Sequence, residues 1–205
     1  MADTNFTALS GSVSRWGHTP PGGGTKWHRF WILVHLDNTQ VPWGDQEVVI
    51  QDQKLFLGVK VGDSETQGKI LYAVKQRLED ARGAYFIAAD GTIGSYYSKK
   101  KSQEVFELSV GLSNLRVFNE PRQPENLVVL CGRVTSVSPG WIQVEERYRN
   151  PRGEGQDAWK SRKVWVYTAV QMDLQEKAQV YVRGRLATKT PDGKEMMYVI
   201  AEKIS

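Results

Sequence analysis

Apolar and polar side chains alternate along much of this chain with a period of two, which predicts β-strands with one buried face. The clearest example is the segment 179–186. Its apolar row consists of Val180, Val182 and Leu186, and its aromatic and basic row consists of Tyr181, Arg183 and Arg185. The first row should lie inside a barrel and the second row outside it.

A turn follows this strand and predicts a β-hairpin. Pro191 presets its own backbone angle and Gly193 tolerates a positive φ, so residues 190–193 suit a tight turn. Residues 196–200 form the expected return strand. Gly184 lies on the apolar row, where it leaves room for the sharp bend of a closing barrel.

Similar patterns predict strands in both halves of the chain. Pro and Gly mark loops at 19–25, 38–45 and 150–156, and turns at 90–91 and 138–140. The expected strands cover residues 6–16, 27–36, 47–61 with a bend at 51–53, 84–89, 92–97, 105–118 with a break at Gly111, 127–137, 141–149 and 162–168.

One segment has helical periodicity. Ser64 and Gln67 have capping-box spacing, and Arg82 with Gly83 suits the end of a helix. The apolar face repeats at a period of 3.6 and consists of Ile70, Leu71, Val74, Leu78 and Ala81.

The order of these elements is the same in the two halves: three strand regions, a helical or polar segment, and two further strands. This is the order of the OB-fold, a small five-stranded barrel. We therefore expect a mainly β protein with two OB-fold-like barrels in tandem, each with one helix between its third and fourth strands. The domains would be residues 1–120 and 126–205, joined by a proline-containing linker at 121–125.

The residues 180–186, the polar turn after them and the strand ending in Ile200-Ala201 resemble the last hairpin of bacterial single-stranded-DNA-binding proteins. The segment 168–177 lies where that family has its helix, and the resemblance covers residues 126–205. It implies sequence-independent binding that protects single-stranded DNA in replication and recombination. Members of the family usually carry a long tail with an acidic, hydrophobic tip that recruits partners. This chain ends at Ser205, so a phage or mobile-element variant fits the pattern.

The amino-acid composition is compatible with binding of single-stranded DNA. The chain has 205 residues, 40% of them hydrophobic, and a net charge of +4. The excess of basic residues lies within 121–205, which holds 14 basic and 10 acidic side chains. Seven Trp and eight Tyr supply flat surfaces for unstacked bases.

Location is predicted from what the sequence lacks. It has no apolar run of the roughly 18 residues that cross a membrane, and its first residues are polar, so we expect neither a membrane anchor nor a secretory signal. The single cysteine, Cys131, excludes an internal disulfide and is expected to be a buried small side chain. We expect a cytoplasmic protein, associated with the nucleoid or, if phage-encoded, in the host cytoplasm.

In the second half, Lys163, Trp165 and Tyr167 share a strand face opposite Val164 and Val166. This outer row is a candidate surface for stacking bases. Cations beside the loop at 150–156, among them Arg147, Lys160 and Arg162, are candidates for phosphate contacts. The other candidate nucleic-acid-binding residues of this half are Arg149, Arg152, Trp159, Tyr181, Arg183 and Arg185.

In the first half, Trp27, Arg29 and Trp31 lie on one strand face. The second candidate group there is a basic, aromatic hairpin formed by Tyr96, Tyr97, Lys99, Lys100 and Lys101. Either group would contact nucleic acid, pack against other protein or, in the case of the hairpin, remain a solvated loop.

An enzymatic function is not expected. Gly22–Lys26 lacks the Gly-Lys-Ser/Thr order of a phosphate loop, and no catalytic constellation can be named. His28 and His35 point to opposite faces of a strand, so we expect no metal site and no cofactor. Two alternatives remain, RNA binding and an OB-like interaction module in a replication or secretion assembly. The expected partners are single-stranded DNA, a second copy of the chain or replication proteins.

Overall fold

The computed structural model describes residues 6–22, 28–62, 64–80, 86–98, 102–118, 120, 125–149, 159–169 and 173–205. The described part is mainly β, with twelve strands and one helix. Its contacts divide the chain into two units. The first unit contains Thr7–Asn38 and Gln51–Asn126, and the second contains Thr39–Ile50 and Leu127–Ser205.

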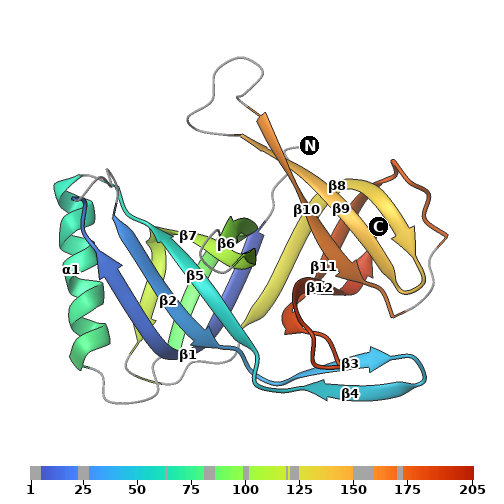
Figure 1. The fold of residues 1–205 in the computed structure, drawn as a ribbon, viewed down its shortest axis with the longest axis horizontal. Helices are drawn as coiled ribbons and strands as arrows, with labels where there is room; N and C mark the ends of the chain where they lie inside the picture. The colour runs from blue at the N-terminus through green and yellow to red at the C-terminus, as the bar shows by residue number, and fades with distance from the viewer. Residues whose placement is uncertain are drawn as a thin grey trace. The chain divides into compact units, whose positions relative to one another are not determined.

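The strands of the first unit pair in the order β1-β2-β5-β7-β6, and β6 pairs back with β1 (Figure 1). Only the β5–β7 pair is parallel, and the others are antiparallel. The elements are β1 (Phe6–Thr19), β2 (Arg29–His35), β5 (Lys54–Lys60), α1 (Glu65–Asp80), β6 (Phe86–Ser98) and β7 (Gln103–Phe118).

The inner face of β2 is the one that alternation predicts. Phe30, Ile32 and Val34 are buried, whereas Arg29 is exposed and Trp31 is half-buried. The predicted bend before β5 is also present, with Asp52 at a φ of 52°.

Helix α1 begins and packs as its pattern predicts. The Ser64 hydroxyl accepts a hydrogen bond from the Gln67 amide at 3.3 Å, which satisfies a free donor of the first turn. Leu71, Val74 and Leu78 are buried, and the Arg77 guanidinium donates to the Val117 carbonyl of β7 at 2.9 Å. The predicted end, from Ala81 to Gly83, lies outside the described residues.

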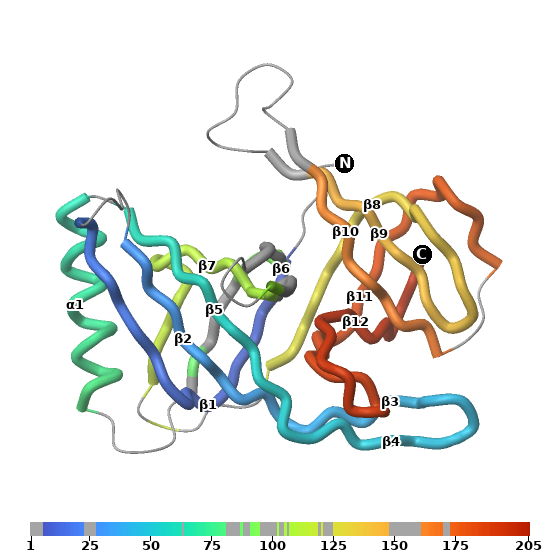
Figure 2. The backbone as a smooth tube through the Cα atoms, in the orientation of Figure 1, coloured from blue at the N-terminus to red at the C-terminus, as the bar shows by residue number. Residues whose placement is uncertain are grey.

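In the second unit the strands pair in the order β8-β9-β10-β12-β11, and β11 pairs with β8 to close a five-stranded barrel (Figure 2). The β10–β12 pair is parallel, as β5–β7 is in the first unit. The strands are β8 (Asn126–Ser138), β9 (Trp141–Arg149), β10 (Trp159–Tyr167), β11 (Gln179–Lys189) and β12 (Glu195–Ile204).

The predicted hairpin is β11–β12. Gly184 sits at a register shift, and a Cβ added there would collide with the Ile200 carbonyl oxygen. The turn is closed by the Gly193 amide, which donates to the Thr190 carbonyl at 2.9 Å, with Gly193 at a φ of 85°. The close approach and the positive φ explain both glycines.

The break expected at 38–45 is wrong. This segment forms β3 (Thr39–Trp43), which pairs with β4 (Gln46–Ile50) in a separate two-stranded ribbon. Pro42 is tolerated because a ribbon of two strands leaves one side of each strand without a partner. Gly44 turns the chain at a φ of 61°. By its contacts, this hairpin groups with the second unit.

Three further expectations about elements are wrong. Between β10 and β11, the described residues 168–169 and 173–178 hold no helix, because the chain pairs with β8 through Lys177 and Ala178. The turn expected at 90–91 is a register shift within continuous β6, and β7 is unbroken at Gly111.

No described helix is long and apolar enough to cross a membrane.

Candidate nucleic-acid interface

The outer face of β9–β10 carries the predicted aromatic and basic row. Val164 and Val166 point inward and are buried, so Lys163 and Trp165 point outward. Lys163 is exposed and Trp165 is half-buried. Their direct partners on β9 are Glu145 and Gln143. The predicted register of β10 is confirmed at these positions.

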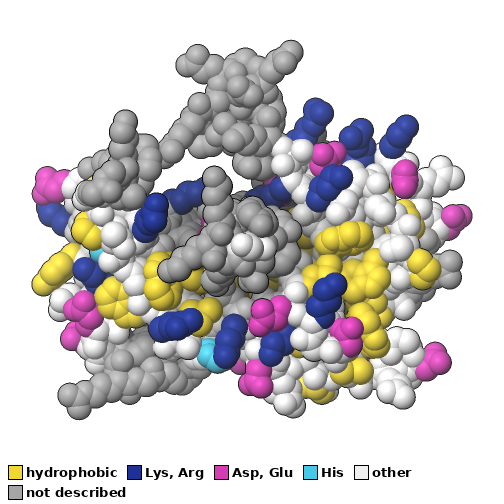
Figure 3. All heavy atoms as spheres, viewed as in Figure 1, with side chains coloured by type: hydrophobic (Ala, Val, Ile, Leu, Met, Phe, Trp, Pro, Cys, Tyr) yellow, Lys and Arg dark blue, Asp and Glu magenta, His cyan; other side chains and the backbone are white. Residues whose placement is uncertain are grey.

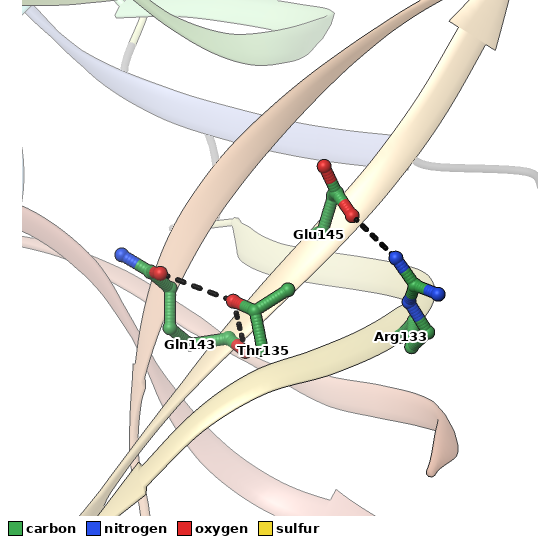
Figure 4. Close-up of polar contacts among 4 residues, drawn as sticks. All are labelled: Arg133, Thr135, Gln143 and Glu145. Atoms are coloured by element: carbon green, nitrogen blue, oxygen red, sulfur yellow. Dashed lines mark hydrogen bonds and ion pairs between the residues drawn. The ribbon is translucent and has the colours of Figure 1, made fainter. Parts of the chain in front are cut away.

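Charge on this face is mixed rather than purely basic. Glu145 lies between Lys163 on β10 and Arg133 on β8. Its carboxylate forms an ion pair with Arg133 at 3.2 Å (Figure 4). Hydrogen bonds from Ser161 and from Arg133 lower the pKa of Glu145. This carboxylate therefore stays ionised and offsets part of the positive charge available to phosphates.

A polar contact next to this ion pair fixes the adjoining part of the face. The Thr135 hydroxyl lies 3.0 Å from the Gln143 side-chain oxygen and 3.3 Å from the Gln143 carbonyl (Figure 4). Gln143 is the direct partner of Trp165 across β9–β10. The surroundings of Trp165 are thereby held by side chains on two neighbouring strands.

Arg162 does not belong to the outer row. It faces Glu146 across β10 and β9, and its Nε and Nη2 lie 2.6 and 2.9 Å from the Glu146 carboxylate oxygens. The side chains are 18% and 4% exposed. The expectation that Arg162 is available to phosphates is wrong, because alternation from Lys163 turns it inward.

Tyr167 is also not an outer stacking residue. It is only 6% exposed, because the β3–β4 hairpin covers it. The Trp43 ring stacks on the Tyr167 ring at 4.8 Å between centroids and 30° between planes. Burial raises the pKa of the Tyr167 phenol, and a backbone hydrogen bond from Gly44 partly offsets this rise.

Trp141 lies at the centre of what we call the aromatic cluster, which also includes Trp43, Trp165, Tyr167 and Tyr198. Its ring centroid is 6.5 Å from Trp165, 5.1 Å from Tyr167 and 5.0 Å from Tyr198. The sequence pattern did not identify Trp141 or Trp43 as site residues. Trp141 lies opposite Tyr167 in the β9–β10 pair, a register that the sequence pattern does not give. Figure 3 shows hydrophobic side chains gathered over the second unit, with Lys and Arg beside them.

The candidates on β11 lie on another side of the barrel. Tyr181 is 41% exposed and Arg183 is exposed, as expected. Their partners are Cys131 and Val129 of β8, so they do not join the β9–β10 face. Cys131 is half-buried rather than buried. Arg185 is already engaged, since its Nε lies 2.9 Å from Glu202 and its Nη2 donates to the Gln40 carbonyl at 3.2 Å.

In the first unit, Trp31 is half-buried and stacks on Phe56 of β5, at 5.5 Å and 17°. Gly17 makes room for the indole, because a Cβ there would lie 2.6 Å from the Trp31 ring. Arg29 is exposed on the same face of β2. The sequence pattern did not single out Phe56, although it alternates with Leu55 and Leu57, which are buried.

A carboxylate adjoins this aromatic pair. Gly58, two residues after Phe56 on β5, lies against the Glu107 side chain of β7, since a Cβ on Gly58 would lie 2.7 Å from a Glu107 carboxylate oxygen. Burial raises the pKa of Glu107, and Lys60 partly offsets the rise. The face therefore contains an acid whose charge depends on pH near its aromatic residues.

Several candidates cannot be placed. Trp27, Lys99, Lys100, Lys101 and Arg152 lie outside the described residues. For five others the structure describes the backbone but not the side chain. These are Tyr96 and Tyr97 in β6, Arg149 in β9, and Trp159 and Lys160 in β10. These assignments stay predictions.

The histidines form a pair that the sequence pattern did not predict. His18 Nε2 lies 2.9 Å from His28 Nδ1, and the rings stack at 5.2 Å. Desolvation, Lys75 and His28 together lower the pKa of His18, which disfavours its charged form. Within the described residues, no group of three or more His, Cys, Asp or Glu side chains could hold a metal ion.

No protein-family model and no curated protein matches the sequence. Solved structures do resemble it. A deletion mutant of the single-stranded DNA binding protein from Thermus aquaticus is 13% identical, with a TM-score of 0.64 over 100% of this chain and 95% of that chain. The wild-type protein from the same organism is 15% identical, with a TM-score of 0.58 over 100% and 93% of the two chains. The chain thus has an OB-fold like that of this single-stranded DNA binding protein.

Proposed function

We propose that the protein binds single-stranded DNA without sequence preference, through two tandem OB-fold barrels. The observation that most directly supports this proposal is that half-buried aromatic rings lie on the second and third strands of each unit. These are Trp31 and Phe56 on β2 and β5, and Trp141 and Trp165 on β9 and β10. In OB-folds that bind oligonucleotides, this face is the binding face.

Each of these rings offers a surface that an unpaired base can stack on, with a gain of about 1–3 kcal/mol per base. Stacking does not depend on base identity, because every base has a π-face. Arg133, Arg147 and Lys163 supply charge on the β8–β10 side, with Glu145 reducing it. Affinity should therefore depend more on stacking than on phosphate contacts.

Single-stranded DNA as the ligand suits roles in replication or recombination, where unpaired strands need protection. The fold likeness to the Thermus aquaticus protein supports this proposal. RNA would use the same stacking and phosphate contacts, and only contacts to the 2′-hydroxyl would discriminate the two. The proposed role needs neither a cofactor nor a catalytic residue.

The test compares two neighbours on β10 that point in opposite directions. Trp165→Ala should weaken binding to a dT oligonucleotide by about 1–3 kcal/mol and leave the melting temperature nearly unchanged. Val166→Ala should lower stability by about 1–3 kcal/mol and leave the affinity of the folded protein unchanged. If neither variant binds differently from the wild type, this aromatic face is an assembly surface and the proposal loses its main support.

A further inference from the structure

We propose that Trp43, which lies in the first half of the sequence, is a base-stacking residue of the second barrel. It would join Trp141 and Trp165 in one DNA-contacting surface. The inference rests on the proposed single-stranded DNA binding and names a contact outside the five barrel strands. It gives the β3–β4 hairpin a role in ligand binding.

The hairpin is a fixed part of the second unit. Val41 and Ile50 are buried in one cluster with Ala187 and Ile200 of the barrel strands. Arg185 adds a hydrogen bond to the Gln40 carbonyl. Removing the hairpin would expose these apolar side chains to water, so it does not act as a lid that DNA displaces.

Trp43 is held by its contacts with Tyr167. The two rings stack at 4.8 Å, and the neighbouring Gly44 makes a backbone hydrogen bond to the phenol. Trp43 thereby covers one face of the Tyr167 ring. Its indole is only half-buried, so part of it remains accessible to a ligand.

The three indoles are contiguous. The Trp141 ring lies between the other two, 6.1 Å from Trp43 at 78° and 6.5 Å from Trp165 at 87°. Near-perpendicular neighbours present faces in different directions, so successive bases of a flexible strand can each find a ring.

The experiment uses the full chain and fluorescein-labelled dT oligonucleotides, with affinity read by anisotropy. Trp43→Leu keeps apolar packing but removes the flat ring, and Trp43→Phe restores a smaller one. Val49→Ala is the matched control, since Val49 is 45% exposed on β4 of the same hairpin. We expect a 5- to 150-fold loss of affinity for Trp43→Leu, which is the cost of about one lost stack. Trp43→Phe should recover most of the loss, and Val49→Ala should bind as the wild type does.

If Trp43→Leu lowers the melting temperature, a second measurement on the wild-type protein tests whether Trp43 contacts DNA. Wild-type protein is irradiated with oligonucleotides that contain 5-iododeoxyuridine, and mass spectrometry identifies the crosslinked residue. A crosslink at Trp43 supports the inference, whereas crosslinks at Trp165 but not at Trp43 overturn it. Wild-type-like binding by Trp43→Leu also overturns it and leaves the proposed function intact. Failure of the wild type to bind any oligonucleotide overturns both.

Discussion

Arg162 and Glu146 form a two-point ion pair inside the barrel of the second unit, with contacts of 2.6 and 2.9 Å between adjacent strands. Glu146 is almost completely buried. The mutual attraction of a buried pair offsets much of the hydration that its charges lose, so removing only one partner leaves the other charge buried without compensation. The pair therefore matters more for the integrity of the barrel than for binding phosphates.

Removal of one partner should leave an uncompensated charge. Glu146→Ala should lower the free energy of unfolding by about 3–5 kcal/mol. The double variant Glu146→Leu with Arg162→Met should lose far less, since it replaces both charges by apolar groups. Urea unfolding of the single and double variants measures the coupling. Strictly additive losses would show that the two side chains do not stabilise each other.

Val41 tests the assignment of the hairpin to the second unit. It is fully buried in the core cluster with Tyr167 and Ile200. Val41→Ala should lower stability by about 1–3 kcal/mol. Hydrogen exchange followed by mass spectrometry should show faster exchange in β10 and β12 and unchanged exchange in β1 and β2. The reverse distribution would contradict the division of the chain into these two units.

Glu107 gives a prediction about pH. Its pKa is raised by burial, so the folded state favours the protonated carboxyl. The free energy of unfolding should therefore fall as pH rises through the raised pKa and the carboxyl ionises. Protonation also removes a negative charge beside Gly58 and near Lys60. Wild-type affinity for a dT oligonucleotide should therefore increase as pH falls through this pKa.

Glu107→Gln should bind more tightly than the wild type at pH values above this pKa and should lose this part of the pH profile. The matched variant Glu145→Gln should leave that part unchanged, because the pKa of Glu145 is lowered and its titration lies at more acidic pH. Anisotropy titrations between about pH 5 and pH 8 compare the three proteins. Identical profiles for wild type and Glu107→Gln would place Glu107 away from the bound strand.

Two glycines should respond to alanine in opposite ways. Gly184→Ala should destabilise the second unit by about 1–3 kcal/mol or more, because its Cβ would meet the Ile200 backbone. Gly68 lies in α1 with open space around it. Gly68→Ala should stabilise the protein by about 0.5–1 kcal/mol. Thermal melts of the two variants measure both effects. Equal changes in melting temperature would contradict the prediction that an alanine side chain at position 184 collides with the Ile200 backbone.

Local patterns predicted the strands that form the core of each unit. Alternation placed Ile32, Val166 and Val182 inside, and capping chemistry placed the start of α1 at Ser64. Such features depend on neighbours within one element, so the sequence alone carries them. Gly184 was also explained correctly because a glycine on an apolar row has few other uses.

Features that depend on distant partners could not be predicted. Tyr167 has the alternation of an outward residue, yet it is buried because a hairpin more than a hundred positions earlier covers it. Arg162 is a cation beside a loop, yet its partner Glu146 lies inside the barrel. Pro42 and Gly44 indicate a loop locally, whereas the two-stranded ribbon tolerates both.

The most direct test of the central claim is titration of the intrinsic tryptophan fluorescence with poly-dT at several salt concentrations, alongside poly-U and duplex DNA. Stacking on the half-buried indoles should quench the signal with poly-dT, and duplex DNA should give little change. Log affinity should fall linearly with log salt, with a slope of about −0.7 per phosphate contact and about 3–5 such contacts. An unchanged signal with all three nucleic acids, at every salt concentration, would contradict the account.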